Sequence, residues 1–432
     1  MSNKVALLLL FALTGLFANA QQTWSLQQCL DAGLKNSIPV KIKQLEITRS
    51  QKLYTNPLLE LVPTVSLNGN HNYNFGSTID PSTNARVSSD IQSDNLYLNA
   101  NVNLLDFTML ATARKNKIDI AIARADAAVI SYEYKLQLLS FYFDALFSQE
   151  LVKIQIEQLE NTTYNLERIT KEVQIGSKPQ SDLYDIRLAF SQDEKRLMEA
   201  RQLFDVQKLQ LFQLMNVATD KLSEVQLDYI LAALEEDSTV IGSNPKIELA
   251  ALQYESAQKA IAIQRSVNLP TVSAFYNMST FYSAPLQGSG AGVTNFGTQL
   301  EDNKNHQAGL QVSIPVFTGF RRNRQITASK IEAEKSKWAS EQEKNLVKQE
   351  IEQEEKRQLQ YEQLSVNIRN TVQYARESFQ TTQSKFLSGK IEAVLYTTVK
   401  NQLLASEYDR LKNDLQLQRS RIKLSILRTN GM

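Results

Sequence analysis

The sequence predicts an α+β membrane protein in which two tandem repeats each supply one pair of membrane-spanning strands and two long helices. Three observations predict this class. The same landmarks occur twice in the same order, four segments alternate apolar and polar residues, and two very long stretches contain no glycine or proline. Because the 432 residues include only 14 glycines and 9 prolines, we expect long uninterrupted elements, chiefly helices.

The chain begins with a predicted secretory signal peptide at residues 1–20. A basic residue precedes an apolar run from Val5 to Phe17, and the small residues that follow predict cleavage after Ala20. The apolar core is too short to span a bilayer, and no later apolar stretch reaches the roughly 18 residues that a membrane-spanning helix needs. If the mature protein enters a membrane, it must therefore do so as a closed β-barrel.

The composition argues against several other classes of protein. The 47 Lys and Arg residues balance 46 Asp and Glu residues, so no basic field exists to collect nucleic acid. Cys29 is the only cysteine, and we expect it to be a buried apolar side chain rather than a disulfide partner or a lipid anchor. His71 and His306 lack other ligands at metal-binding spacing, so we expect no metal site. Catalytic Ser/His/Asp or Cys/His arrangements and phosphate loops are also missing, so we expect no enzyme and no cofactor.

Repeated landmarks divide the chain into two halves. The motif Pro-Thr-Val-Ser occurs at 63–66 and 270–273, a Phe-Thr pair before basic residues at 107–108 and 317–318, and a turn glycine at 176 and 389. The shared order indicates a tandem duplication. The predicted organisation is a signal peptide at 1–20, a first repeat at 21–217, an equatorial linker at 218–244 and a second repeat at 245–432.

Each repeat is predicted to contain a helix, two strands, a long helix, a turn and another helix. In the first repeat we expect strands at about 63–75 and 94–107 and helices at about 26–61, 109–175 and 179–217. In the second we expect strands at about 270–282 and 306–318 and helices at about 246–269, 320–387 and 391–428. Each of the two longest helices would extend roughly 100 Å. Apolar residues recur at seven-residue spacing in the long helix, which predicts coiled-coil packing through Val152, Leu159, Leu166 and Val173.

The four predicted strands carry the membrane signal. Val65 and Leu67 alternate with Thr64, Ser66 and Asn68, and the other three strands repeat this period of two. A half-buried strand of a soluble sandwich would show the same alternation. The secretion signal, the asparagine-rich polar face and the long polar links within each strand pair instead favour a bacterial outer-membrane barrel with a water-filled interior.

Four strands are too few to close a membrane barrel, since the smallest such barrels have about eight. An open edge in lipid would leave backbone groups unpaired, at a cost of several kcal/mol each. The chain must therefore associate with copies of itself in a closed ring, two copies giving eight strands and three giving twelve.

Taken together, these features resemble the TolC-like outer-membrane efflux proteins, the outer-membrane factors of tripartite efflux and type I secretion systems. The resemblance covers about Trp24 to Arg428 and is carried by the opening segment 26–36, the paired Pro-Thr-Val-Ser motifs, the strand exits and the two helical hairpin tips. It implies a homotrimer whose 12-stranded transmembrane β-barrel, with four strands per chain, continues as a long periplasmic α-helical coiled-coil barrel. It also implies docking to a periplasmic adaptor (membrane fusion) protein and to an inner-membrane pump of the RND, ABC or MFS type.

The expected function is that of a passive exit duct in the bacterial outer membrane, with the helical part in the periplasm. The alternative is a trimeric outer-membrane coiled-coil adhesin or structural protein. An adhesin would carry one barrel segment at the end of a stalk, whereas the predicted strands here lie inside both halves of the chain.

The resemblance also assigns the two hairpin tips. It places adaptor docking at the turn residues Gly176, Ser177, Lys178, Gly389 and Lys390, although Ser177 replaces the leucine usual in the family. The second tip lacks the two aspartates that the family often has there. We expect carboxylates from Asp182, Asp185 or Glu392 to line the periplasmic aperture, the alternative being solvated carboxylates at helix ends.

Overall fold

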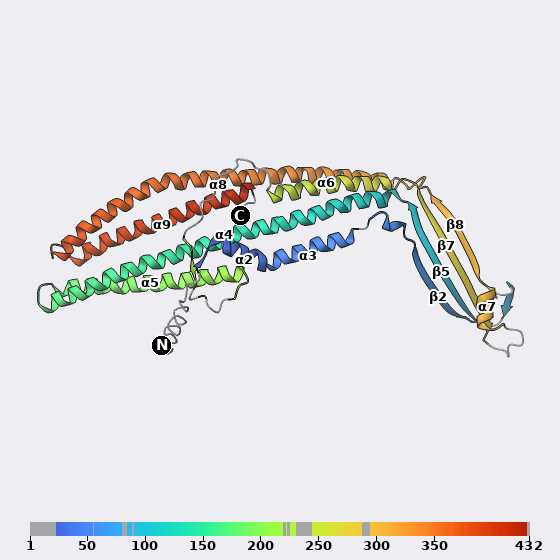
Figure 1. Ribbon diagram of the computed structural model, residues 1–432, viewed down its shortest axis with the longest axis horizontal. Coiled ribbons are helices and arrows are strands. Elements are labelled where there is room, and N and C mark those ends of the chain that lie inside the picture. Colours follow the sequence, from blue (N-terminus) through green and yellow to red (C-terminus); the bar gives the residue numbers. More distant parts are fainter. Residues whose placement is uncertain are drawn as a thin grey trace, which may run out of the picture. The chain divides into compact units, whose positions relative to one another are not determined.

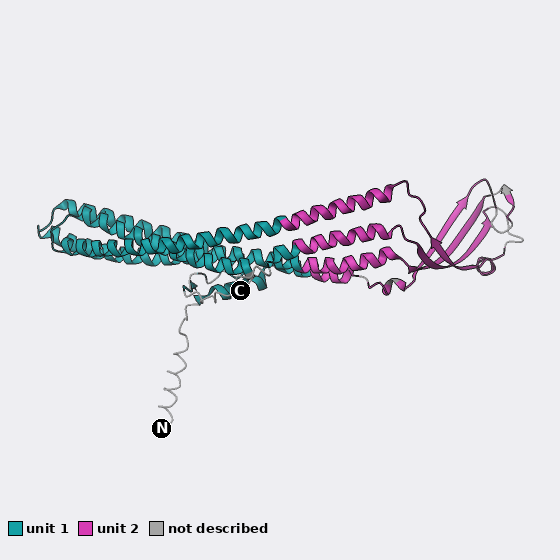
Figure 2. Cartoon of the chain, turned by 90° about the horizontal axis from the view of Figure 1, so that it is seen from above, with its two compact units in different colours: residues 1–45, 125–249, 342–432 teal, residues 46–124, 250–341 magenta. Residues whose placement is uncertain are grey.

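The computed structural model describes residues 23–54, 56–79, 84–88, 90–218, 222, 225–229, 244–286 and 294–429. The predicted signal peptide and most of the predicted linker at 218–244 lie outside the described residues. The chain divides into two compact units (Figure 2), unit 1 being 1–45, 125–249 and 342–432, and unit 2 being 46–124 and 250–341. Each unit therefore combines segments from both predicted repeats. No helix in the described part of the chain is long and apolar enough to cross a membrane.

Unit 2 contains a four-stranded antiparallel sheet with the strand order β2-β5-β7-β8 (Figure 1). Its strands are β2 (Thr64–Asn74), β5 (Ile91–Leu105), β7 (Thr271–Pro285) and β8 (Asn305–Ser313). The two strands from the first half of the chain thus pair directly with the two from the second half, through β5 and β7. The number and the pairing of strands agree with the four strands per chain that the alternating pattern predicts.

Two strand boundaries differ from the expected ones for local reasons. The fourth strand was expected to reach residue 318 but ends at Ser313, because Pro315 lacks the backbone N–H that a continuing ladder needs. The second strand begins at Ile91 rather than 94, within the expected polar link. Described parts of the two links also form elements of their own, namely the hairpin of β3 (Ser77–Ile79) with β4 (Arg86–Ser88) and the helix α7 (Phe296–Asp302).

The expected single helix at 26–61 is wrong. The chain forms α2 (Leu26–Asn36), α3 (Ile38–Leu53) and a short 3-10 turn at Leu59–Leu61. α2 begins at a capping box, in which the Ser25 hydroxyl accepts from the Gln28 N–H and the Gln28 side chain accepts from the Ser25 N–H. α2 ends at Asn36, and Ser37 has extended backbone (φ −57°, ψ 120°). Pro39 lacks the N–H that a continuous helix would need there, whereas in the first turn of α3 that N–H has no helical partner.

The long helices form two hairpins. α4 (Phe107–Gln174) turns into α5 (Gln180–Leu214), and α8 (Arg321–Leu387) turns into α9 (Ala393–Thr429). A shorter helix, α6 (Pro245–Ser266), leads into β7. α4 follows β5 at once because the Asp106 carboxylate accepts hydrogen bonds from the N–H groups of Thr108 and Met109, at 2.7 and 3.3 Å, and so caps the helix.

The main core of unit 1 joins α2, α4, α5, α8 and α9 around buried side chains such as Leu30, Tyr142 and Leu211. A small parallel pair, β1 (Thr23–Trp24) with β6 (Gln226–Leu227), packs on α4. The Gln149 amide accepts from the Leu227 N–H at 2.7 Å and donates to the Leu227 carbonyl at 2.9 Å, so that a helix side chain completes the hydrogen bonding of a free strand edge.

Candidate functional site

One face of the four-stranded sheet is apolar and uncovered. Cross-strand pairing brings together Val65, Ala100, Tyr276 and Ala308 in one row and Leu67, Leu98, Met278 and His306 in the next. The side chains are largely exposed, Leu67 by 71% and Leu310 by 70%. Large apolar side chains on a long, otherwise open sheet indicate a surface that meets lipid or another apolar partner.

The opposite face is polar and rich in amides. The register confirms the predicted alternation, since Thr64 lies opposite Asn101, Ser66 opposite Asn99, and Asn99 in turn opposite Asn277. The polar face also carries a few aromatic rings, among them Tyr97 and Phe275. Amide side chains cost several kcal/mol in hydrocarbon without partners, so this face must meet water.

Both edges of the sheet carry free backbone groups. Among the described residues, β2 pairs only with β5, and β8 pairs only with β7. The edge strands also run in opposite directions, because four antiparallel strands alternate. β8 of one copy is therefore oriented to pair with β2 of another copy in the same antiparallel manner.

The apolar face is interrupted at the end of the sheet near the β3–β4 hairpin. His71 lies directly opposite Asp94 and forms an ion pair with it if protonated, and Gln92 donates to the other carboxylate oxygen at 3.0 Å. On β7, α7 covers the same region, since the Thr280 hydroxyl donates to the Leu300 carbonyl at 2.6 Å and the Phe296 ring packs edge-on against Tyr282. The apolar surface is thus bounded by polar pairs and a helix.

Each hairpin tip in unit 1 turns through a glycine in the left-handed region. Gly176 has φ +77° and Gly389 has φ +72°. In both turns the glycine N–H and the next N–H bond back to the last helical carbonyls, Gly176 to Val173 at 3.0 Å and Ser177 to Glu172 at 2.8 Å in the first. This is the Schellman arrangement, which favours glycine because a Cβ is strained at positive φ.

An apolar cluster joins the two hairpins next to their tips. It consists of buried side chains from α4, α5, α8 and α9: Ile169, Leu183, Ile186, Phe386, Ala393 and Tyr396. The Phe386 and Tyr396 rings stack at 4.4 Å, and the Arg168 guanidinium lies 4.7 Å from the centre of the Phe386 ring. A cation on an aromatic face in a desolvated site contributes about 2 kcal/mol.

The expected tip residues occupy different environments. Asp182 is buried, 4% exposed, and forms an ion pair of 3.1 Å with Lys178, one turn earlier. Asp185 is partly exposed and Glu392 is exposed. Gly176, Ser177, Gly389 and Lys390 are exposed at the turns. The two open carboxylates therefore come from different hairpins, and Asp182 instead orders the first turn.

Sequence reasoning missed a buried polar network between the hairpins. The Lys400 ammonium on α9 donates to Asp193 of α5 at 2.5 Å and to the Thr162 hydroxyl of α4 at 2.8 Å, and the lysine is 1% exposed. Nearby, the Asn165 amide donates to the Tyr396 hydroxyl at 3.0 Å. The sequence did contain one indication that Lys400 is buried. It lies four residues from both Tyr396 and Leu404, so all three side chains share one face of the helix.

The buried row of α4 also differs from the expected heptad stripe. Val152, Leu159, Leu166 and Val173 are only partly buried. Positions one residue before or three residues after the stripe are buried instead, and most of them are polar: Gln155, Gln158, Thr162, Asn165 and Ile169. The heptad spacing was right, but the register of the packed face was decided by the neighbouring helices.

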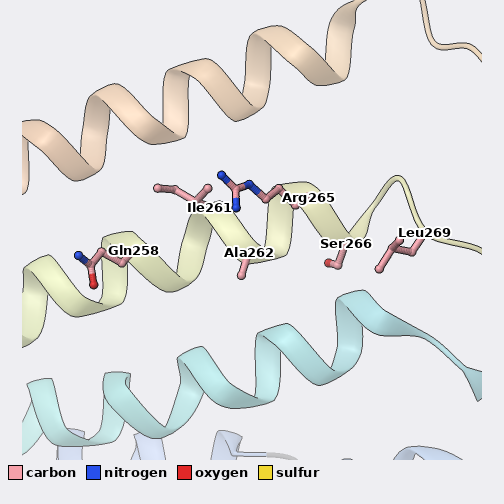
Figure 3. Close-up of a pocket in the computed structure, with 6 residues that line it drawn as sticks. All are labelled: Gln258, Ile261, Ala262, Arg265, Ser266 and Leu269. Atoms are coloured by element: carbon pink, nitrogen blue, oxygen red, sulfur yellow. The ribbon is translucent and has the colours of Figure 1, made fainter.

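Other candidates do not form a site in the described residues. Cys29 is fully buried, as expected, and burial raises the pKa of its thiol to about 12. No cluster of three potential metal ligands occurs in the described part of the chain. A hollow along one face of α6 is lined by six residues (Figure 3): Gln258, Ile261, Ala262, Arg265, Ser266 and Leu269. Most of them are exposed, so the hollow is an open depression of the surface and not an enclosed cavity.

Comparison with known proteins identifies the fold. Residues 238–427 match the family model described as outer membrane efflux protein. The outer membrane channel CmeC of Campylobacter jejuni matches with a TM-score of 0.78 at 14% identity, covering 94% of this chain and 86% of that chain. VceC, an outer membrane protein of Vibrio cholerae, matches with a TM-score of 0.74 at 15% identity, covering 93% and 94%. The open state of the MtrE outer membrane channel of Neisseria gonorrhoeae matches with a TM-score of 0.70 at 14% identity, covering 95% and 91%. No curated protein sequence matches the chain.

The four-stranded sheet with one apolar and one amide face, together with two long helical hairpins, is the fold of these outer-membrane channels. The match to the outer membrane efflux protein model falls in the second half of the chain, whereas the likeness in fold to CmeC and VceC extends over nearly the whole chain.

Proposed function

We propose that the chain is the exit duct of a tripartite efflux or type I secretion system. It is a passive conduit, with the strands of unit 2 in the bacterial outer membrane and the helical hairpins of unit 1 in the periplasm. The family match names outer-membrane efflux, and the fold of the solved channels supports the same role. Neither comparison favours the coiled-coil adhesin alternative.

The observation that carries the proposal is the open sheet with two different faces. An apolar face exposed over β2 and β8 suits lipid, and an amide face suits an aqueous passage. Two free edges in lipid would cost several kcal/mol for each unpaired group, so the sheet has to close on further copies. Three copies give twelve strands in a closed ring, which leaves no edge.

The helical hairpins supply the contacts to the rest of the assembly in this proposal. The turns at Gly176, Ser177 and Lys178 and at Gly389 and Lys390 dock to a periplasmic adaptor protein, which in turn links the duct to an inner-membrane pump of the RND, ABC or MFS type. Exposed backbone in a Schellman turn and the absence of a Cβ leave room for a partner's side chains to approach closely.

The periplasmic aperture is lined by carboxylates. Asp185 and Glu392 fit this role in the proposal because both are open to solvent. Asp182 contributes indirectly, since its ion pair with Lys178 fixes the first turn of α5 next to Asp185.

Mass measurement and conductance together test the proposal. The protein extracted in mild detergent should have three times the chain mass and should form discrete conducting channels in a planar bilayer. A monomer that stays folded in detergent would contradict closure by self-association. Crosslinking in intact cells should capture an adaptor and a pump through single cysteines at Ser177 or Lys390, and not through a cysteine at the solvent-exposed Lys195 in the middle of α5.

A further inference from the structure

The polar face of the sheet carries no charged side chain on any of its four strands, all of which lie in described residues. The register assigns six residues of β2 to this face: Thr64, Ser66, Asn68, Asn70, Asn72 and Asn74. From β8 it assigns Asn305, Gln307, Gly309, Gln311 and Ser313. The two central strands add Asn95, Asn99, Asn101 and Asn103 from β5, and Asn277 with several serines from β7.

The histidines and the one carboxylate of the strands lie on the other face. His71 and Asp94 pair with each other across β2 and β5, and His306 bonds to the Tyr276 hydroxyl at 2.7 Å. Their cross-strand neighbours belong to the apolar rows. The single carboxylate of the four strands and both of their histidines therefore lie on the apolar face, and the polar face carries no charge.

The aromatic rings on the polar face lie against the sheet where the structure shows their contacts. A Cβ on Gly309 would meet the Phe275 ring at 2.8 Å, so the ring of Phe275 lies over the glycine of the neighbouring strand. A ring packed on a glycine in this way stays close to the backbone. Apart from these rings, the polar face presents amides and hydroxyls, which both donate and accept hydrogen bonds.

Charge selectivity in pores arises from rings of charged side chains or from oriented dipoles that favour one sign. In a closed ring of three copies, each charged residue on this face would occur three times around the aqueous passage, and the summed charge would favour ions of the opposite sign. Freely rotating amides present an oxygen or an N–H to either sign. Nothing on the strands then distinguishes an anion from a cation.

We propose, on the basis of the proposed duct, that the passage through the strands admits solutes without regard to the sign of their charge. It takes cationic, anionic and neutral polar cargo alike and limits them by size and hydrogen bonding. Any selection by charge is made outside the sheet, where carboxylates such as Asp185 and Glu392 are open to solvent.

A local chemical probe tests this at mid-sheet. Asn99 lies on the polar face of β5 between Ser66 and Asn277. In Asn99→Cys, the introduced thiolate would attack a methanethiosulfonate reagent, forming a mixed disulfide and releasing methanesulfinate. Reagents carrying a trimethylammonium or a sulfonate group would be added to the trimer in lipid vesicles. After normalisation to a free thiol, the two rates should agree within about threefold, since a tenfold ratio corresponds to about 1.4 kcal/mol of preference. Cys29 is buried and should stay unreacted.

Two further variants separate the possible outcomes. Asn277→Asp in the Asn99→Cys background places a carboxylate beside the thiol and should raise the preference for the cationic reagent about tenfold, which calibrates the probe. Leu98→Cys, on the apolar face, should react with neither reagent. If the Asn99→Cys thiol, without the second substitution, reacts tenfold or more faster with the reagent of one charge, the proposal of a charge-indifferent passage is wrong, but the proposed duct is not contradicted. If Leu98→Cys reacts and Asn99→Cys does not, the amide face is not the aqueous one, and the proposed duct fails as well.

Discussion

The Nζ of Lys400 lies 2.5 Å from the Oδ2 of Asp193, and both residues are only 1% exposed. This ion pair joins α9 to α5, and the Thr162 hydroxyl connects it to α4 through bonds to both charged groups. Three long helices from both halves of the chain therefore meet at one buried polar point. Close to the hairpin tips, the apolar cluster around Phe386 and Tyr396 continues the same contact.

Removing one partner of this pair should destabilise unit 1 strongly. Lys400→Met keeps the side-chain volume but leaves the buried Asp193 carboxylate with only the more distant Arg196, at 3.5 Å, as a cation. Breaking a buried pair costs about 3–5 kcal/mol. The double variant Lys400→Met with Asp193→Leu should recover most of that loss, because no buried charge remains. Urea unfolding followed by circular dichroism would measure both. Equal destabilisation in the single and double variants would show that the pair acts through packing alone.

The second hairpin should weaken in acid. Burial would raise the pKa of the Glu354 carboxyl, but hydrogen bonds from Ser420 and Lys423, together with the charges of Lys423 and Arg357, outweigh burial and lower the pKa below its usual 4.5. A carboxyl whose pKa is lowered by folding stabilises the folded state above its unfolded pKa, and that contribution is lost as the pH falls through the folded pKa. Melting temperatures between pH 6 and pH 3, at intervals of about half a unit, should fall below about pH 4.5. In Glu354→Gln the fall should be smaller, and an unchanged fall would assign it to other groups.

The two faces of β5 should respond oppositely to a charge. Leu98→Arg places a guanidinium on the apolar face and should cost about 2–4 kcal/mol if the residue lies near the middle of the membrane. Asn101→Arg, three residues along on the amide face, should be tolerated and should change single-channel conductance. The yield of assembled trimer in outer-membrane fractions measures the first effect. Similar yields for both variants would contradict the face assignment.

The glycine turn of the first tip should be required for export but not for assembly. Gly176→Trp introduces strain at φ +77°, about 1–2 kcal/mol, and places an indole where the proposed adaptor docks. Export should stop while trimer formation and delivery to the outer membrane continue. Gly176→Ala carries the same strain without the bulk, so it should export at a rate close to wild type. Full export by the Trp variant would remove this tip from the docking surface.

Carboxylates at the aperture should govern block by divalent cations. Like charges held close together around an axis attract cations, so Asp185→Ala and Glu392→Ala should each reduce block of planar-bilayer current from the periplasmic side. Asp182→Ala should reduce block less, because that carboxylate is already paired with Lys178. Block unchanged in the combined Asp185→Ala and Glu392→Ala variant would place the aperture elsewhere.

Much of this molecule was determined by local patterns in the sequence. Strict alternation over Thr64–Asn74 leaves only one way to place apolar side chains on a single face, and the observed register keeps that face across all four strands. Glycines at 176 and 389 in otherwise unbroken helical sequence likewise predicted both tip turns, because a helix that ends in a left-handed residue favours glycine.

Only the tertiary structure decided which helix positions are packed and which charges are paired. Heptad spacing in α4 was visible in the sequence, but the buried row passes through Thr162 and Asn165. The partners of these side chains come from α5 and α9, namely Asp193 and Lys400 for Thr162 and Tyr396 for Asn165. From the sequence, Asp182 was expected to be a solvent-exposed carboxylate, but in the folded turn it lies 3.1 Å from the Lys178 ammonium. Sequence periodicity reports the spacing of a helix face, whereas the free energy of burying a charge depends on groups that only folding brings together.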